Sequence, residues 1–176
     1  MHETPCIICN QAGREPSIEH IIPQSIGNVH YILHKGIVCK HCNNKIARIE
    51  SAVLNNRYFL EKRKPHLLET LPDRPLPLET QQRFLLKMAY EALYKSRNKV
   101  WSSLDHDRCR SFILHGGTWP LINRETTALN FKSIPRWWNA YVLKRNKIFL
   151  GYQVSIQQEI SVQFRYYGLQ MTMRIH

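Results

Sequence analysis

A chain of 176 residues, 43% hydrophobic and 22% charged, is long enough for one ordinary core or for a small stapled unit beside a modest core. No apolar run approaches the roughly 18 to 20 residues of a membrane-spanning helix, so a helical membrane protein is excluded. The formal net charge of +12 makes acidic partners the expected ones.

The positive charge is concentrated in the second part of the chain. Residues 1–80 hold 10 Lys/Arg and 8 Asp/Glu, whereas residues 81–176 hold 15 and 5. An excess of this size is typical of proteins that bind a polyanion, because neutralised phosphates release counterions. We therefore expect a nucleic-acid partner, and the alternative is a basic surface that is merely solvated.

Two C-x-x-C pairs, Cys6–Cys9 and Cys39–Cys42, predict a metal site. Thiolates at this spacing can grip one ion, and two pairs supply the four ligands of a tetrahedral structural zinc site. A site filled by four cysteines leaves no open position for catalysis. The N-terminus resembles no secretion signal, so we expect a reducing, cytoplasmic location in which metal is favoured over disulfides. Cys109 stands alone and is expected to be a small buried hydrophobe.

Residues 17–23, between the two pairs, have strand character and end at a proline. Glu19 and His20 are adjacent and would point to opposite faces of a regular strand. A bulge or a strand end could let the carboxylate hold a metal while the imidazole faces a water. Gly27-Asn28 is a turn signal, so a hairpin or a loop should follow.

After Cys42 the apolar residues Ile46, Ile49, Val53 and Leu54 recur at helical spacing. Asn43 or Asn44 lies where a helix N-cap is expected. An amide carbonyl is also a good oxygen ligand for Mg²⁺, so capping and metal binding are both open for these residues.

Taken together, C-I-I-C, E-H-I-I-P and C-K-H-C-N with a following helix resemble the HNH endonucleases, the ββα-metal nucleases with a zinc knuckle. The resemblance covers residues 6 to about 55. The run E-H-I-I-P-Q-S-I (residues 19–26) is also similar to the D-H-I-V-P-Q-S run of the HNH domain in RNA-guided nucleases.

The resemblance implies a role for each matched residue. His20 would be the general base that takes a proton from the attacking water. Glu19 and Asn43 would hold one catalytic Mg²⁺ or Mn²⁺. Two positions stay open: the middle motif residue is His34 or, as the second choice, His30, and Asn44 or Glu50 could replace Asn43 as the ligand on the helix.

Beyond the motif, residues 63–78 are rich in proline and predict a linker between a unit at 1–62 and a basic α+β region at 79–176. From Thr80 onward, apolar residues at helical spacing predict a core helix with basic residues on its other face. A second helix is expected from Asp107 to Leu114, ending at Gly116-Gly117. The acids in Asp105-His106-Asp107 are better explained by this helix start than by a second metal cluster.

The last part of the chain predicts an antiparallel sheet. Residues 140–144, 148–156, 160–167 and 169–175 are rich in β-branched and aromatic residues and are separated by turn signals. Cations alternate with aromatics here, and such a surface can follow phosphates and stack bases. In the alternative, the aromatic residues form the core of the sheet. The predicted contacts to nucleic acid are Arg136, Lys144, Arg145 and Lys147.

The sequence therefore predicts an α+β protein, with a zinc-stapled ββα-metal unit followed by a helix-plus-sheet region. The resemblance implies Mg²⁺-dependent hydrolysis of phosphodiester bonds, with DNA as the expected substrate and with defence or mobile elements among its contexts. One alternative is a non-catalytic zinc module that binds nucleic acid. Another is a nuclease subunit activated by a protein partner, and a homodimer is also open.

Overall fold

The computed structural model describes residues 4–63, 76–97, 99–119, 122–125, 139–143, 148–154, 160–166 and 169–175. The helices are α1 (Lys40–Leu54), α2 (Arg57–Arg63), α3 (Leu78–Ser96) and α4 (His106–His115). The strands are β1 (Pro16–His20), β2 (Ile32–Cys39), β3 (Ile122–Glu125), β4 (Asn139–Leu143), β5 (Ile148–Val154), β6 (Ile160–Tyr166) and β7 (Leu169–Ile175). Helices with two antiparallel sheets confirm the predicted α+β class.

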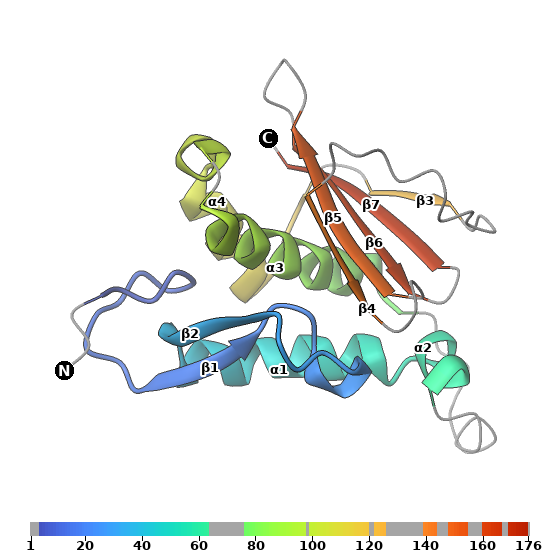
Figure 1. Ribbon diagram of the computed structural model, residues 1–176, viewed down its shortest axis with the longest axis horizontal. Coiled ribbons are helices and arrows are strands. Elements are labelled where there is room, and N and C mark those ends of the chain that lie inside the picture. The colour runs from blue at the N-terminus through green and yellow to red at the C-terminus, as the bar shows by residue number, and fades with distance from the viewer. Residues whose placement is uncertain are drawn as a thin grey trace.

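The hairpin β1–β2 packs on α1 to form a ββα layer at the N-terminal end of the chain (Figure 1). Its register is interrupted, because Ser17 lies opposite Val38 while Glu19 lies opposite Leu33. Gly36 has φ +95°, which allows β2 to bend at this irregularity. The predicted bulge or strand end is confirmed on both counts, since His20 is also the last residue of β1.

Strand β2 runs directly into α1. Cys39 ends the strand and is the N-cap residue of the helix, with extended backbone angles (φ −78°, ψ 156°). Asn43 and Asn44 therefore lie inside the helix, and the capping role predicted for one of them is wrong. The apolar stripe predicted for this helix is confirmed, because Ile46, Ile49, Val53 and Leu54 are all buried.

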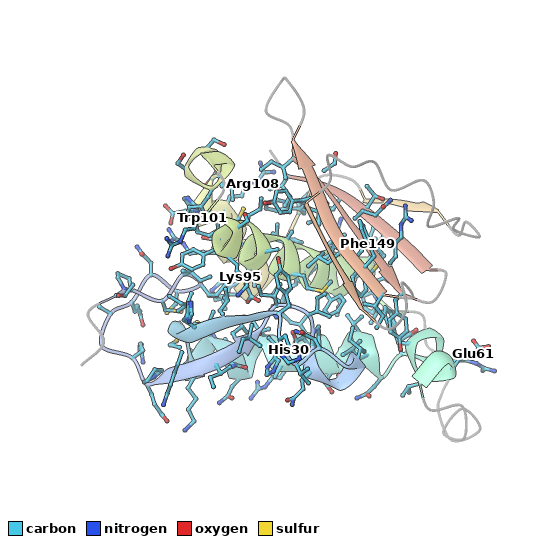
Figure 2. The ribbon with its side chains drawn as sticks, viewed as in Figure 1. His30, Glu61, Lys95, Trp101, Arg108 and Phe149 are labelled. Atoms are coloured by element: carbon cyan, nitrogen blue, oxygen red, sulfur yellow. The ribbon has the colours of Figure 1, made fainter. Side chains whose placement is uncertain are left out.

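Helix α3 lies at the centre of the molecule, with α1 on one side and the C-terminal sheet on the other (Figure 1). The predicted core stripe is confirmed by the buried residues Phe84, Leu85, Met88, Ala89, Ala92 and Leu93. The expectation that the basic residues face away from the core is wrong for Lys87, which is only 1% exposed. Lys95, two turns further along, is exposed and donates from Nζ to the Ile32 carbonyl at 2.7 Å (Figure 2).

The C-terminal sheet has the strand order β3-β7-β6-β5-β4, with every described pair antiparallel. The four strands expected from residue 140 onward are confirmed as β4 to β7. Strand β3 was not expected, and it pairs with β7 at the edge of the sheet. Tyr152 and Tyr166 are buried here, so both belong to the core instead of an exposed stacking surface.

Helix α4 begins as predicted. The Asp105 side chain caps it by accepting a hydrogen bond from the Arg108 backbone N–H at 3.0 Å, and the helix ends at Gly116. Cys109 is fully buried, as expected for a lone thiol. The predicted 63–78 linker and the division of the chain that rests on it stay predictions, because residues 64–75 lie outside the described residues. Within the described part, none of the helices has the length and apolar character needed to cross a membrane.

Candidate functional site

The four cysteines of the two predicted pairs meet in space. The Sγ atoms of Cys6, Cys9, Cys39 and Cys42 all lie within 4.8 Å of one another, and no disulfide joins them. A tetrahedral zinc ion with Zn–S distances of about 2.3 Å requires thiolates clustered on this scale. In the described residues, this is the only group of three or more His, Cys, Asp or Glu side chains placed to hold a metal ion.

The electrostatics of the cluster favour a bound cation. The hydrogen bond from Cys42 lowers the pKa of the Cys6 thiol to about 4, while the same contact raises the pKa of Cys42. Burial also raises the pKa of the Cys9 thiol, so ionisation is favoured at Cys6 and opposed at Cys9 and Cys42. A cation among the sulfurs removes that opposition, because a coordinated thiol is deprotonated. The cysteines therefore fit a structural metal.

A second site lies on the hairpin, in an open cleft of about 440 Å³. The predicted residues Glu19, His20 and Asn43 line it together with Glu50, and the other lining residues are Ile18, Pro23, Gln24 and Ser25. The structure thus brings the predicted base and both predicted metal ligands together. Of the two fallback ligands on α1, Glu50 lines the cleft and Asn44 does not.

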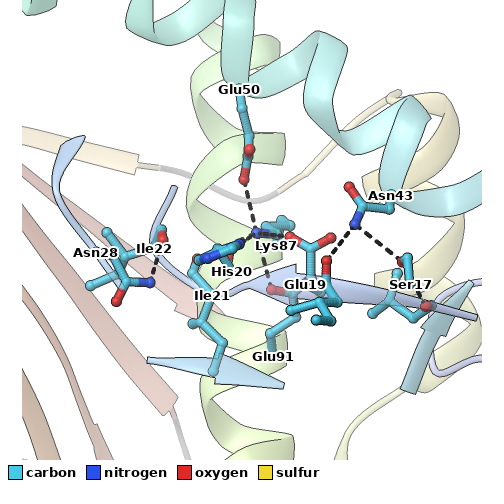
Figure 3. Close-up of polar contacts among 12 residues, drawn as sticks. Ser17, Glu19, His20, Ile21, Ile22, Asn28, Asn43, Glu50, Lys87 and Glu91 are labelled. Atoms are coloured by element: carbon cyan, nitrogen blue, oxygen red, sulfur yellow. Dashed lines mark hydrogen bonds and ion pairs between the residues drawn. The ribbon is translucent and has the colours of Figure 1, made fainter. Parts of the chain in front are cut away.

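Glu19 is 3% exposed and has one paired and one unpaired carboxylate oxygen. Its Oε1 lies 2.7 Å from the Lys87 Nζ, whereas its buried Oε2 accepts no hydrogen bond from any described residue (Figure 3). Burial raises the pKa of the carboxyl, and the ammonium of Lys87 partly offsets this. An orphaned carboxylate oxygen in a cleft is an open position for a cation.

Asn43 reaches from the second turn of α1 across to β1. Its Nδ2 donates to the Ser17 hydroxyl at 3.1 Å and to the Ile18 carbonyl at 2.8 Å (Figure 3). Because the amide nitrogen is committed to the strand, Oδ1 is held in a fixed orientation, and no described residue donates to it. Asn43 therefore does not cap the helix. Its side chain joins α1 to β1, and its Oδ1 atom is available to bind a cation.

His20 is half-buried, and its ring makes no hydrogen bond to any described residue. Burial and the nearby charge of Lys87 lower the pKa of the imidazole, while Glu50 acts in the opposite direction. A lowered pKa keeps the ring neutral near pH 7. A neutral imidazole is the form that accepts a proton.

The loop that follows His20 is organised by Asn28, which is fully buried. Its Nδ2 donates to the carbonyls of Ile22 (2.6 Å) and Tyr31 (2.9 Å), and its Oδ1 accepts from the backbone N–H of Tyr31 at 2.8 Å. These bonds close the loop between β1 and β2. The sequence marked Asn28 only as part of a turn signal with Gly27.

The two candidates for the middle motif residue lie elsewhere. His34 and His30 are exposed, and neither lines the cleft that holds His20. His34 instead lines a separate cleft with Trp101 and Lys95. Side-chain hydrogen bonds of Asn28, and not of either histidine, close the loop between β1 and β2.

Lys87 is the residue of this site that the sequence interpretation missed. Its Nζ lies within 3.1 Å of carboxylate oxygens from Glu19, Glu50 and Glu91 (Figure 3). Burial opposes its charge, but these carboxylates outweigh burial and raise its pKa well above the ordinary value. The signal in the sequence was Lys87 and Glu91, one helical turn apart, as the only charges in the apolar run 84–93.

The site fits a divalent cation. Three carboxylates surround one ammonium, so two negative charges are unbalanced when all are ionised. Burial raises the pKa of Glu91 well above its ordinary value, and the same holds in direction for Glu19. The side-chain oxygens of Glu19, Asn43 and Glu50 are the kind of donors that Mg²⁺ or Mn²⁺ prefers. The predicted nucleic-acid contacts Arg136, Lys144, Arg145 and Lys147 lie outside the described residues.

Comparison with known proteins identifies the N-terminal part. Residues 6–57 match a family model described as HNH endonuclease. Searches of curated proteins and of solved structures found no match. The matched segment holds the cysteine cluster together with Glu19, His20 and Asn43. Over residues 6–57 the chain is therefore similar to the HNH endonuclease family, as the resemblance predicted.

Proposed function

We propose that this protein is a divalent-metal-dependent endonuclease that hydrolyses phosphodiester bonds in DNA. The observation that carries the proposal is the cleft in which Glu19, His20 and Asn43 converge, with an unpaired buried oxygen on Glu19. The match to the HNH endonuclease family supports a nuclease-like role for the same segment. The net charge of +12 supports a polyanionic substrate.

The chemistry begins at His20. Its ring is half-buried, makes no hydrogen bond to any described residue and has a lowered pKa, so the neutral form is available to take a proton from an attacking water. General-base catalysis of this kind contributes typically about 10²- to 10⁴-fold. The fixed position of His20 at the end of β1 holds the ring toward the cleft for that transfer.

Glu19 Oε2 and Asn43 Oδ1 are the atoms proposed to hold Mg²⁺ or Mn²⁺, with Glu50 as a further donor. When bound, the ion supplies Lewis-acid stabilisation of phosphoryl charge and of the leaving oxygen. The hydrogen bonds from Asn43 to β1 orient its oxygen in advance. Pre-orientation of this kind lowers the cost of assembling the site.

The metal proposed for the cysteine cluster is zinc, in a structural role. Cys6 and Cys9 come from the N-terminal loop, while Cys39 and Cys42 come from the start of α1. An ion shared among them joins the loop to the helix that carries Asn43. Zinc thereby supports the catalytic cleft without entering the reaction.

The test is cleavage of supercoiled plasmid, single-stranded DNA and RNA by the purified, zinc-loaded protein, with Mg²⁺, with Mn²⁺ and with EDTA. Cleavage of DNA that requires the divalent ion supports the proposal. Cleavage of RNA but not of DNA would show that the substrate is RNA and would contradict the proposed DNA substrate. DNA binding without cleavage under every condition would support the non-catalytic binding module instead.

A further inference from the structure

Lys87 couples helix α3 to the proposed nuclease cleft. It lies thirty residues beyond the end of the family match at residue 57, and it is 1% exposed. A lysine this deeply buried is uncommon unless it is paired, and Lys87 is paired with residues of the matched segment. Its ammonium therefore has contacts that the match to the HNH family does not account for.

The first set of contacts is with the backbone of the catalytic strand. Lys87 Nζ donates to the His20 carbonyl at 2.7 Å and lies 3.3 Å from the Ile21 carbonyl. These two carbonyls follow the register irregularity, at the point where β1 ends. An ammonium that donates hydrogen bonds to two consecutive carbonyls fixes the direction in which the chain leaves the strand. It thereby also fixes the backbone position from which the His20 side chain extends.

The second set of contacts is with the carboxylates of the cleft. Nζ lies 2.7 Å from Glu19 Oε1 and 2.8 Å from Glu50 Oε1, which come from β1 and α1 respectively. Because the ammonium holds one oxygen of Glu19, the other oxygen is the one left for a cation. Glu91, on the same helix as Lys87, completes the charge cluster from the side of α3.

We propose that Lys87 is a positioning residue of the nuclease site, which sets the backbone of His20 and the orientation of Glu19 from outside the HNH segment. The inference rests on the proposed function and goes beyond it, because it makes helix α3 part of the catalytic apparatus. Lys87 does not touch the reacting atoms. It acts through the residues that do.

The variant that tests this is Lys87→Met, which keeps the length of the side chain and removes the ammonium. Misplacement of catalytic groups by about 1 Å can cost about 10²-fold, so we expect kcat to fall by about 100-fold. Removing a positive charge beside Glu19 favours a divalent cation, so Mn²⁺ measured by electron paramagnetic resonance should bind as tightly as in wild type or more tightly.

The matched control is Lys95→Met. Lys95 lies on the same helix and also donates to a carbonyl of the hairpin, that of Ile32, but it does not line the cleft. Its cleavage rate and Mn²⁺ affinity should be unchanged. The ring signals of His20 in nuclear magnetic resonance spectra should move in Lys87→Met and stay in place in Lys95→Met.

Folding and zinc content are measured on every variant. If Lys87→Met does not fold, the double variant Lys87→Met/Glu91→Gln replaces it, because it removes one carboxylate from the buried cluster. In a folded, zinc-loaded protein, a wild-type kcat would overturn the proposal. If both Mn²⁺ binding and kcat are lost, the proposal is also overturned, because Lys87 would then be needed for the structure of the whole site and not for positioning His20 and Glu19.

Failure of the proposed function has a different signature. In that case wild-type protein does not cut any substrate, and the comparison of kcat has no meaning. The positioning role is then decided by the His20 ring signals. Movement in Lys87→Met but not in Lys95→Met supports it, and equal spectra contradict it.

Discussion

At the scale of single residues, the site depends on neighbours that a regular strand would separate. Glu19 and His20 are adjacent, yet both line the same cleft because the register of β1 and β2 is interrupted beside them. Burial then shifts their pKa values in opposite directions, upward for Glu19 and downward for His20. Glu19 is held by Lys87 and presents one oxygen, while His20 keeps a neutral ring.

Replacing Glu19 by Gln tests the ligand role. The amide keeps the size of the side chain but removes the charge that a divalent cation needs, so the Mg²⁺ concentration for half-maximal cleavage should rise by at least about 10-fold. The measurement is a titration of cleavage rate against Mg²⁺. An unchanged midpoint in a folded protein would remove Glu19 from the metal site.

Asn28→Ala tests the residue that closes the loop between β1 and β2. It removes the hydrogen bonds that Asn28 makes with the buried Ile22 carbonyl and with the backbone N–H and carbonyl of Tyr31, which should lower the free energy of unfolding by about 1–3 kcal/mol. Denaturant unfolding checks this, with the exposed Asn44→Ala expected within about 0.5 kcal/mol of wild type as the control. Equal stability of both variants would contradict the assigned role.

The sequence was informative for residues that carry a motif and silent for those that support it. The repeated spacing of the two cysteine pairs predicted the cysteine cluster, and the motif that contains Glu19, His20 and Asn43 predicted their convergence in the cleft. Lys87 belongs to no motif, and helical periodicity describes an apolar face without showing that a cation lies buried on it. Asn28 looked like any turn residue, because its hydrogen bonds depend on the path of the loop.

At the scale of elements, the cysteine cluster and helix α1 form one structural unit. Cys39 and Cys42 occupy the N-cap and the first turn, so an ion held by the four cysteines would also anchor the helix that carries Asn43 and Glu50. The N-cap was predicted four or five residues too late, because asparagine is a common capping residue and cysteine is not. The N-cap residue Cys39 belongs instead to the cysteine cluster and makes no side-chain capping hydrogen bond.

Cys6→Ser should lose bound zinc and lower the melting temperature, since structural zinc contributes folding free energy directly. The matched control is Cys109→Ser, a second buried cysteine that lies outside the cluster and should keep its zinc. Metal analysis and thermal unfolding give the two readouts. Full zinc content in Cys6→Ser would contradict the four-cysteine site.

Strands were predicted correctly where their sequences are rich in residues that favour β-structure. Strands β4 to β7 are rich in β-branched and aromatic residues, whereas β3 has the sequence I-N-R-E and resembles a loop. It is a strand because the free edge of β7 is available to it. Such pairing is a property of the assembled sheet and not of the four residues.

At the scale of the whole molecule, α3 links the two chemical parts of the chain. It packs on α1 on one side and contacts β5, β6 and β7 on the other, and buried residues of both parts form one apolar core. The C-terminal sheet thereby packs against the helix that carries Lys87. The excess of positive charge after residue 80 gives that region a second proposed role, attraction of the substrate.

The variant Lys144→Ala/Arg145→Ala/Lys147→Ala tests this second role. Each lost phosphate contact should reduce the slope of log affinity against log salt concentration by about 0.9 for duplex DNA. Fluorescence anisotropy at several salt concentrations measures the slope. Lys40→Ala is the control, because Lys40 is already paired with Glu15 at 2.6 Å. Equal slopes for both variants would show that these cations do not contact DNA.

The most direct test of the central claim compares single-turnover cleavage of DNA by wild type, His20→Ala and the exposed control His41→Ala, each folded and zinc-loaded. We expect the rate with Mg²⁺ to fall by at least about 10²-fold in His20→Ala and to be unchanged in His41→Ala. A His20→Ala protein that cuts DNA at the wild-type rate would contradict the assignment of His20 as the general base.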